Sequence, residues 1–499
     1  MMRAMRSVCA VVQCVFVAGA ATAATYWVNA ENLDPETGET KASIDRHEIG
    51  FTPENGFGTL AEASSWTSAS GTVFKVCPGI YDAGVYNGRN RLLVRPNTTW
   101  IAVEGPEKTV ILGRHGSGEG CDEFGNGTGA LRCVMIQSGS EIRGFTLTGG
   151  ATANANDSDI GYGGAVQAKN ATGVRIVDCI ISNNTAYSCA AAYMGTFINC
   201  RFFDNKSLNG PGIGQSLSMI NCVTKDSYGI YAVNQSVRLV NCTFGSHTGS
   251  PNGAYNPQWG AVNMGNAPVN CIFISTADLA TTSGGAASKC ASNCLYIADF
   301  PHGGTRVNCR KVTLAELDLD EDLKPSRSSA AVAFGSTDDF PAEYLGYATI
   351  DRTPRVLDDG KIDAGAYEYD WRADYAAAIG EGVTVTNVSS IVKMGADGKV
   401  SIPDGAEISG TLATPEVRTR VGYSAFSSDA GTLYGDFANG DSGRSLDAFA
   451  VTDSEEARSF AVRRDVPIGF SFRFDGEGYG SVYGLTAVSE ILGLQLFIR

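Results

Sequence analysis

The chain has 499 residues, 60 of them glycine, and only 18% are charged. This composition excludes a coiled coil, a helical bundle, a collagen and a disordered tail, and it indicates many short strands joined by turns. The formal net charge of −15 argues against a nucleic-acid partner, because no basic excess is available to release counterions from phosphate.

The first 23 residues have the pattern of a secretory signal peptide. Arg3 and Arg6 supply the positive start, Val8–Ala18 is an apolar run, and Ala21-Thr22-Ala23 is a small-x-small cleavage site. The apolar run is too short to span a bilayer, and no later stretch approaches about 18 apolar residues. We therefore predict cleavage after Ala23, no transmembrane anchor, and a protein that is secreted or attached to the cell surface.

Short elements follow before any repeat is visible. Alternating apolar and polar residues predict strands, and one short segment reads as a helical turn. The expected strands are Thr25–Ala30, Val73–Val76, Pro78–Tyr81, Ile101–Gly105 and Thr109–Gly113, and the helical turn is Gly58–Ala63.

The cysteines then mark a repeat. Cys179, Cys200, Cys222 and Cys242 follow one another at intervals of 21, 22 and 20 residues. Each follows an Asp or Asn, and the pattern continues at Cys271, Cys294 and Cys309 with Asn270, Asn293 and Asn308. A period of roughly 20–25 residues is typical of a solenoid.

Alignment of the repeats on cysteine produces columns. Three positions before cysteine stand Ile176, Phe197, Met219 and Leu239, and two positions after it stand Ile181, Phe202, Thr224 and Phe244. The alternation predicts strands with one buried face, and its slip at the Asn-Cys pair predicts a bend between two strands. A further strand is expected to begin at a small residue in each repeat, at Gly164–Val166, Ala191–Tyr193, Gly212–Ile213, Gly229–Tyr231, Gly260–Val262 and Gly285–Ala287.

These features predict an all-β chain whose residues 24–370 form a right-handed parallel β-helix with an N-terminal cap over its exposed strand edges. The cysteines are expected to stack as a buried free ladder, and the Asn column to share amide hydrogen bonds along the stack. Bridging between neighbouring cysteines is the alternative. Cys121 and Cys133 lie outside the ladder and are the most plausible disulfide pair.

Several segments resemble the pectin-lyase-like right-handed β-helix proteins of bacterial surfaces. The resemblance covers about residues 25–370, and its last segments are similar to the ending called choice-of-anchor Q. It implies the fold and a surface location, while this fold class hosts lyases, hydrolases, adhesins and spacers alike. The residues that carry it are Tyr26–Asn29, Phe57–Leu60, Pro78–Tyr81, Gly163–Ala165, Asn199–Phe202, Asn241–Phe244, Asn270–Phe273, Asp351–Arg355 and Asp363–Glu368.

Residues 371–499 contain no cysteine and have a different pattern. Gly382–Val388 and Val466–Phe474 alternate like strands, and Asp-Gly pairs at Asp397-Gly398, Asp404-Gly405 and Asp475-Gly476 are hairpin signals. We predict a small β-sandwich-like C-terminal domain.

Candidate catalytic residues come from the repeat columns. Four positions after cysteine, Asp204 and Asp226 are expected to stack on adjacent coils, with Lys206, Lys225 and His247 in nearby columns. Paired carboxylates could serve acid–base chemistry or hold a cation. The favoured alternative is a column of turn residues that face water, where Asn, Asp and Ser belong for backbone reasons.

Two further sets of residues are candidates for binding. Asp157 and Asp159, in a loop with Asn154 and Asn156, could bind calcium, although a solvated loop is the favoured interpretation. Aromatic residues within two coils could stack on sugar rings or pack beneath loops; they are Tyr228, Tyr231, Tyr255 and Trp259. The Arg114-His115-Gly116 segment could face a groove or be an ordinary exposed loop.

Two functions remain open from sequence. The first is an extracellular β-helix protein that binds, adheres to or displays a partner, a polysaccharide being the expected one, without catalysis. The second is a secreted polysaccharide lyase or glycoside hydrolase that acts in a groove along the helix. Neither requires a cofactor, although calcium would suit the second. The sequence leaves the oligomeric state open.

Overall fold

The computed structural model describes most of the chain after the predicted signal peptide, which lies outside the described residues. The described ranges are 24–234, 238–249, 262–263, 268–274, 291–297, 306–338, 340–344, 349–351, 362–388, 392–394, 399–413, 419–428, 431–439, 442, 444–452, 454–462, 468–477 and 479–489. Within them, no helix is long and apolar enough to cross a membrane.

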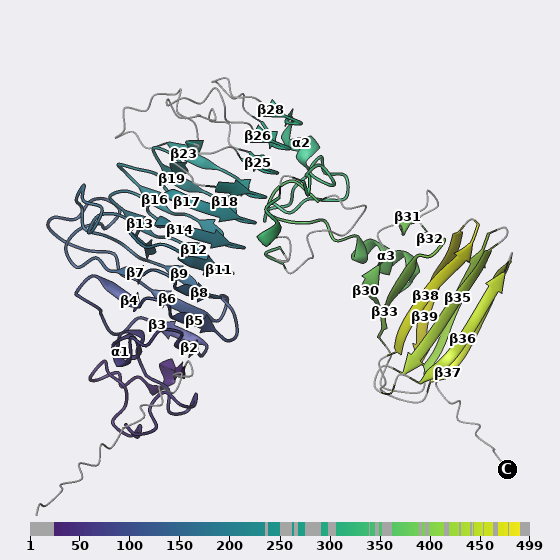
Figure 1. Cartoon of the computed structure of the whole chain (residues 1–499), viewed down its shortest axis with the longest axis horizontal. Helices are drawn as coiled ribbons and strands as arrows, with labels where there is room; N and C mark the ends of the chain where they lie inside the picture. Colours follow the sequence, from purple (N-terminus) through teal and green to yellow (C-terminus); the bar gives the residue numbers. More distant parts are fainter. Residues whose placement is uncertain are drawn as a thin grey trace, which may run out of the picture.

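Three parallel sheets wind around a common axis, as Figure 1 shows for strands stacked from the purple to the teal part of the chain. Sheet 1 consists of β1 (Thr25–Val28), β2 (Val73–Val76), β4 (Asn90–Val94), β5 (Thr99–Ala102), β7 (Arg132–Ile136), β8 (Glu141–Arg143), β10 (Val166–Gln167), β11 (Arg175–Val177), β14 (Ala192–Ile198), β17 (Gly214–Ile220), β20 (Val233–Asn234), β21 (Arg238–Val240) and β24 (Val262–Asn263).

Sheets 2 and 3 complete each coil. Sheet 2 consists of β3 (Gly79–Tyr81), β6 (Thr109–Leu112), β9 (Thr146–Thr148), β12 (Ile180–Ser182), β15 (Arg201–Phe203), β18 (Val223–Lys225), β22 (Thr243–Phe244), β25 (Ile272–Phe273), β27 (Leu295–Tyr296) and β29 (Arg310–Lys311). Sheet 3 consists of β13 (Thr185–Ala186), β16 (Lys206–Ser207), β19 (Ser227–Gly229) and β23 (His247–Gly249), and β26 (Ala291–Ser292) pairs with β28 (Arg306–Val307). A parallel β-helix is thereby confirmed.

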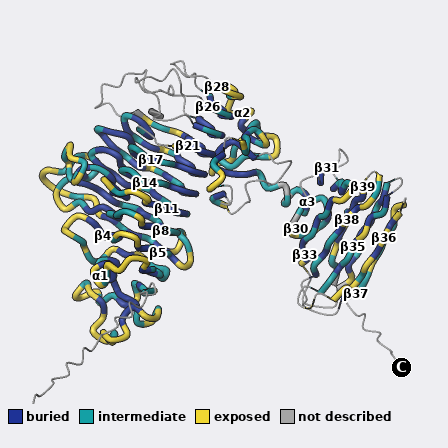
Figure 2. The backbone as a smooth tube through the Cα atoms, in the orientation of Figure 1, coloured by how far each residue is buried: buried dark blue, intermediate teal, exposed yellow. Residues whose placement is uncertain are grey.

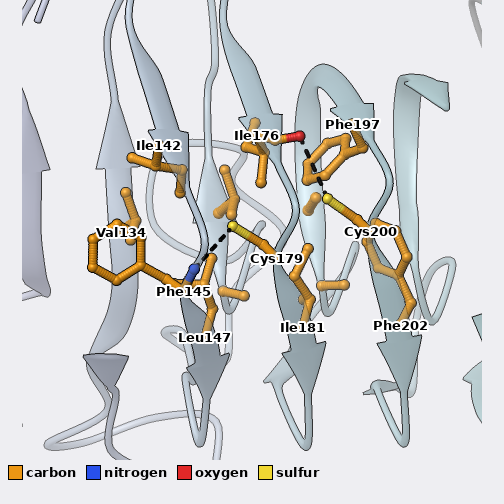
Figure 3. Packing of buried hydrophobic residues seen from close by; sticks show 14 of the residues in the cluster. Val134, Ile142, Phe145, Leu147, Ile176, Cys179, Ile181, Phe197, Cys200 and Phe202 are labelled. Carbon is orange, nitrogen blue, oxygen red and sulfur yellow. Dashed lines mark hydrogen bonds between the residues drawn. The ribbon is translucent and has the colours of Figure 1, made fainter. Parts of the chain in front are cut away.

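The strand register confirms the columns predicted from the repeat. Ile176 pairs with Phe197, Phe197 with Met219, and Met219 with Leu239. On sheet 2, Ile181, Phe202, Thr224 and Phe244 are in register in the same way. All of these side chains are buried, and Figure 3 shows several of them stacked in the interior.

The residue before each cysteine turns the chain from sheet 1 into sheet 2. Its backbone is left-handed at every repeat, with φ between 46° and 54°, at Asp178, Asn199, Asn221, Asn241, Asn270, Asn293 and Asn308. This conformation costs most L-residues about 1–2 kcal/mol, and Asn and Asp tolerate it best after Gly. The predicted bend is therefore present, and its geometry explains the residue type.

The same Asn side chains join successive coils. Asn199 Nδ2 donates to Asp178 Oδ1 at 3.1 Å, and Asn221 Nδ2 donates to Asn199 Oδ1 at 3.1 Å. Higher in the stack, Asn270 donates to Asn241 at 3.0 Å and Asn308 to Asn293 at 2.8 Å. The predicted amide ladder is confirmed for these pairs, and it satisfies polar groups that are buried in the wall of the helix.

The cysteines beside the bend form a column of free thiols. These cysteines are buried and form no disulfide bonds; they are Cys179, Cys200, Cys222, Cys242, Cys271 and Cys294. Each thiol donates to the carbonyl two residues earlier, for example Cys179 to Val177 at 3.2 Å. Burial raises the pKa of the Cys179 and Cys200 thiols well above the usual value, so both remain protonated.

The predicted Cys121–Cys133 disulfide is wrong. Both residues are free, and Cys133 is fully buried, where its thiol donates to Thr148 O at 3.3 Å. Cys121 is half-buried in the loop between β6 and β7, where it donates to Thr128 O at 3.6 Å. Each of the two thiols therefore donates to a different backbone carbonyl, and the two sulfur atoms form no bond with each other.

The small residues expected to begin strands of sheet 1 mostly lie in the corner before them. Strands β10, β17 and β20 begin at Val166, Gly214 and Val233, later than predicted. At this corner the backbones nearly touch: a Cβ on Gly164 would lie 2.2 Å from Thr185 O, and one on Gly212 would lie 2.6 Å from Tyr228 O. Close approach of the chain, and not strand pairing, requires small residues there.

Helical segments near the N-terminus pack against strands of the first coils, where a cap is expected. Helix α1 (Leu60–Trp66) begins after Thr59, whose side chain accepts from Glu62 N. Ser64 and Arg95 tie α1 to the edge strand β4. The 3-10 helix η1 (Ala30–Asn32) lies beside β3, where Ala30 N donates to the Tyr81 hydroxyl at 3.2 Å. The strand edges are thereby shielded from further pairing.

The closing segment, residues 362–368, packs along the solenoid. The Asp363 carboxylate accepts from Ala333 N and Tyr369 N, and Asn241 Nδ2 donates to Asp363 O at 2.9 Å. Gly365 has φ of +93°, and a Cβ there would lie 2.6 Å from Thr243 Oγ1. The segment therefore extends the Asn hydrogen-bond network to a part of the chain more than a hundred residues away. Helices α2 (Leu314–Leu317) and η3 (Ala342–Tyr344) precede it.

A second β body follows helix α3 (Trp371–Ile379), a helix that the sequence pattern does not predict. Sheet 4 has the order β30-β33-β38-β35-β36 and sheet 5 the order β31-β32-β39-β34-β37, with antiparallel pairing. Their bounds are β30 (Val383–Val388), β31 (Lys393–Met394), β32 (Val400–Pro403), β33 (Glu407–Leu412), β34 (Thr419–Ser427), β35 (Gly431–Asn439), β36 (Ser445–Thr452), β37 (Glu455–Val462), β38 (Ile468–Gly476) and β39 (Tyr479–Ser489).

The predicted β-sandwich-like architecture is confirmed by a core between these two sheets. Buried side chains such as Leu433, Phe472 and Val421 alternate with exposed ones, as the changing colours along the strands in Figure 2 show. The turn at Asp404-Gly405 joins β32 of sheet 5 to β33 of sheet 4, so the hairpin predicted there is wrong. Asp-Gly determines the local turn, whereas burial of the apolar faces determines which strands pair.

We predict that the Asn ladder stabilises the solenoid beyond its fit to the bend. Replacement Asn221→Gly keeps the left-handed backbone but removes the buried amide, and we expect it to lower the free energy of unfolding by about 1–3 kcal/mol. Asn183→Gly is the matched control, because Asn183 has φ of 52° and an exposed side chain. Urea denaturation measures both, and equal effects of the two changes would contradict a role for the ladder.

Candidate functional site

A shallow groove lies where the loop between β6 and β7 passes over sheet 3. Its volume is about 320 Å³, and its lining comes from two sources. The loop contributes His115, Gly116, Glu123, Phe124 and Gly125, and the coils contribute Asn183, Thr185 and Lys206. Of the two interpretations of Arg114-His115-Gly116, the groove is thus the one supported for His115 and Gly116.

The loop side of the groove is held by a partly buried hydrogen-bond network. Asp122 accepts from Phe124 N at 3.0 Å and from Asn126 N at 2.8 Å, and Asn126 Nδ2 donates back to Asp122 Oδ2. Asn126, fully buried, also accepts from the Thr185 hydroxyl at 3.2 Å. The loop is therefore fixed to sheet 3, which preorganises the groove for a ligand.

Glycines bring the two arms of the loop together. Gly116 N donates to Gly125 O at 2.7 Å, and a Cβ on Gly116 would lie 2.5 Å from Thr128 O. Gly125 has φ of +78°, where a side chain would be strained, and a Cβ there would lie 2.9 Å from His115 Cβ. These contacts position His115 and Phe124 on one rim.

The coil side of the groove comes from the second corner of the solenoid. Asn183 has φ of 52° and an exposed side chain, Thr185 in β13 is buried, and Lys206 in β16 is half-buried. Thr185 pairs with Lys206 in register. Among the described residues, the Lys206 ammonium forms no ion pair, and an ammonium can donate to an anion or to a hydroxyl group.

Asp204 and Asp226 occupy the turn column and face water. Their φ values are 50° and 54°, and both side chains are exposed. Asp226 accepts from the Ser246 hydroxyl, and its own N–H donates to Ser246 Oγ at 3.0 Å. This geometry supports the turn interpretation, because the left-handed backbone accounts for Asp at both positions.

Lys225 and His247 do not converge on these carboxylates. Lys225 Nζ donates to Glu321 O at 3.0 Å. The His247 Nδ1 atom lies 2.8 Å from the Ser227 hydroxyl, which is buried in sheet 3. The four predicted catalytic residues therefore do not form one site. The two aspartates face water, the lysine contacts a backbone carbonyl, and the histidine contacts a buried hydroxyl.

His247 extends a column of polar residues in the interior, which is not predicted from the sequence. Five positions after cysteine stand Asn184, Asn205, Ser227 and His247. Asn184 Nδ2 donates to Asn205 Oδ1 at 3.0 Å, and Ser227 is in register with His247. Burial lowers the pKa of His247 to about 4, so its ring is neutral at neutral pH.

The aromatic candidates lie in different environments. Tyr231 is only 6% exposed, so its ring cannot stack on a sugar at the surface. The same burial raises the pKa of Tyr231 to about 12. Tyr228 is half-buried, and its ring meets Phe124 edge-on with centroids 5.4 Å apart. It thereby supports the groove. Tyr255 and Trp259 lie outside the described residues.

The loop proposed for calcium is held by its own hydrogen bonds. The Asp157 carboxylate accepts from Asp159 N at 2.8 Å, and Asp159 pairs with Lys169 Nζ at 2.8 Å. Within the described ranges, no group of three or more His, Cys, Asp or Glu residues is placed to hold a metal ion. The calcium site stays a prediction.

The groove places one aromatic side chain among charged and polar ones. Phe124 offers an apolar ring, and Lys206, Glu123 and Asn183 offer donors and acceptors around it. Glu123 and Phe124 are missed from sequence because they lie outside the cysteine repeat and approach it only through folding. The Asp122-to-Asn126 turn chemistry is the local signal that could have identified a structured loop.

Comparisons with known proteins assign no family. No protein-family model matches the chain, and no curated protein matches it. Among solved structures, it is similar to the enzymatically active domain of tailspike protein 4 of bacteriophage CBA120 at 9% identity and a TM-score of 0.16. The match covers 89% of this chain and 57% of that chain, so this chain spans less than two thirds of the phage domain. The fold assignment therefore depends on the strand register above.

We predict that His247 makes the solenoid sensitive to acid. Its folded pKa of about 4 lies below the unfolded value near 6.5. The unfolded state therefore binds the proton more readily, and stability falls as the pH drops from about 6.5 to 4, by up to about 3 kcal/mol. The variant His247→Asn should lose this dependence. Urea unfolding at several pH values tests it, and parallel curves for both proteins would contradict the assignment.

Proposed function

We propose that this chain is an exported β-helix protein that binds a glycan in the groove between the loop after β6 and sheet 3. The observation that supports the proposal is a preorganised groove in which Phe124 lies beside Lys206, Glu123 and Asn183. A sugar ring presents an apolar face and hydroxyl edges, and this arrangement of one aromatic ring and several polar groups complements both.

Export is part of the proposal. The predicted signal peptide at residues 1–23 supports it, as does the similarity of the closing segment to the choice-of-anchor Q ending. In the structure, Asp363 and Gly365 of that segment close the side of the solenoid through Asn241 and Thr243. We propose that the segment ends the β-helix and that the protein is displayed at the cell surface or secreted.

A second candidate function is glycan cleavage in the same groove. Glu123 and Lys206 line it together, and a carboxylate and an ammonium are groups from which acid–base chemistry can be built. Asp204 and Asp226 remain candidates only for this alternative, because the turn geometry accounts for them without catalysis. Bound oligosaccharides can be analysed for unsaturated or reducing-end products, and loss of such products in Glu123→Gln would favour this function.

We predict that groove variants weaken glycan binding. Screening of the purified chain against neutral and acidic oligosaccharides should identify a ligand, and calorimetry then gives its Kd. Phe124→Ala and Lys206→Met should each weaken binding about tenfold or more, which is about 1.4 kcal/mol. Lys225→Met is the matched control, because the Lys225 ammonium contacts Glu321 O outside the groove.

The binding proposal fails if no oligosaccharide in the screen is retained. It also fails if Lys206→Met binds as tightly as the control variant. Thermal unfolding of each variant shows whether the solenoid remains folded, so that a loss of affinity can be attributed to the groove.

A further inference from the structure

The outer face of sheet 5, in the C-terminal β body, carries three aromatic side chains around one enclosed hydroxyl. Strand β34 alternates strictly: Val421, Tyr423 and Ala425 belong to the core between the sheets, and Phe426 lies on the opposite face. In β39, Val482 is a core residue, and a Cβ on Gly480 would lie 2.6 Å from core residue Leu433. Ser481, between these two inward positions, therefore lies on the outer face with Phe426.

The strand register places the aromatic residues beside one another. Phe426 pairs with Ser481, and Tyr483 pairs with Ser424. Tyr479 is 41% exposed, and its ring centroid is 5.7 Å from that of Phe426. Phe426, Tyr479 and Tyr483 thus surround Ser481. We name these three aromatic residues the sheet 5 platform.

The neighbouring strands place small side chains beside Tyr483 of the platform. Ser424 and Ala457 occupy the row that includes Tyr483, where a larger residue on either strand would cover the ring faces. Tyr479 is exposed, and Phe426 and Tyr483 are half-buried. Aromatic rings clustered on an outer sheet face in this way are unusual for a surface that serves only to solubilise a protein. Their arrangement on neighbouring antiparallel strands makes the platform broad and shallow.

Polar groups lie beneath and beside the platform. Ser481 is only 1% exposed, and its hydroxyl has no hydrogen-bond partner within the described part of the chain. A buried hydroxyl without a partner is uncommon and requires an explanation, of which a ligand is one. At one end, Lys399 Nζ lies 3.5 Å from the centre of the Tyr483 ring, and the Tyr483 hydroxyl donates to Glu455.

We propose that the sheet 5 platform binds a flat polysaccharide chain, with sugar rings stacked on Phe426 and Tyr479 and hydroxyl groups near Ser481, Lys399 and Glu455. The broad shape suits a β-linked ribbon, whose successive rings expose C–H faces in one plane. Lys399 and Glu455 carry opposite charges, so the site as a whole favours a neutral ligand. This site is independent of the groove on the solenoid, which supplies the proposed function.

Retention of the full chain on insoluble cellulose and on chitin tests the proposal. We expect retention on at least one of the two, and we expect Tyr479→Ala and Phe426→Ala each to reduce the bound fraction about tenfold. Tyr434→Ala is the matched control, because Tyr434 is 43% exposed on the outer face of sheet 4. Tyr479→Ala should still bind the oligosaccharide identified for the groove with unchanged Kd, which separates this site from the groove.

Three outcomes would overturn the proposal. One is the absence of retention on both polysaccharides, and another is an equal loss in Tyr434→Ala. The third is a dimer in sedimentation experiments that dissociates on Tyr479→Ala, because the platform would then be a contact between two copies of this chain. Thermal unfolding of each variant confirms that the C-terminal β body remains folded.

Discussion

The left-handed bend between sheets 1 and 2 is the constraint on which the solenoid depends. Each coil must turn within one residue, and a φ near 50° allows this at Asn199, Asn221 and their equivalents. The same side chains then hydrogen-bond along the stack, so one residue type satisfies a backbone requirement and joins neighbouring coils. The adjacent cysteine is directed into the core, where a small apolar side chain fits beside the aromatic columns.

The candidate groove is formed by the regular coils of the solenoid together with one irregular loop. The coils supply a flat wall at sheet 3, and the loop after β6 is long enough to fold over that wall. Asn126 connects the two through Thr185. A regular repeat therefore carries an irregular loop, which is the usual way in which a solenoid acquires a binding surface.

Much of the fold follows from the sequence, because residue period, residue type and backbone geometry agree at each Asn-Cys pair. The candidate site is harder to predict from the sequence than the fold. Phe124 and Lys206 are 82 positions apart in the sequence, and only the folded loop brings them to one groove. Asp204 and Asp226 stand out in an alignment of the repeats for the same reason that they are poor catalytic candidates, since the left-handed turn between sheets 2 and 3 favours Asp at both positions. Helix α3 is missed because its signals, an Asp370 cap and a short alanine-rich run, are local and weak.

Cross-linking across the coils tests the register of the solenoid most directly. Ser182 is paired with Phe203 on the next coil, whereas Arg201 is two residues out of register with Ser182. The double variant Ser182→Cys/Phe203→Cys should form a disulfide, because strands in a sheet lie about 4.8 Å apart and a disulfide spans about 4.4–6.8 Å between Cα atoms. Peptide mapping by mass spectrometry should find this bond and should find none in Ser182→Cys/Arg201→Cys. A bond in the second pair but not in the first would contradict the coil assignment and the columns derived from it.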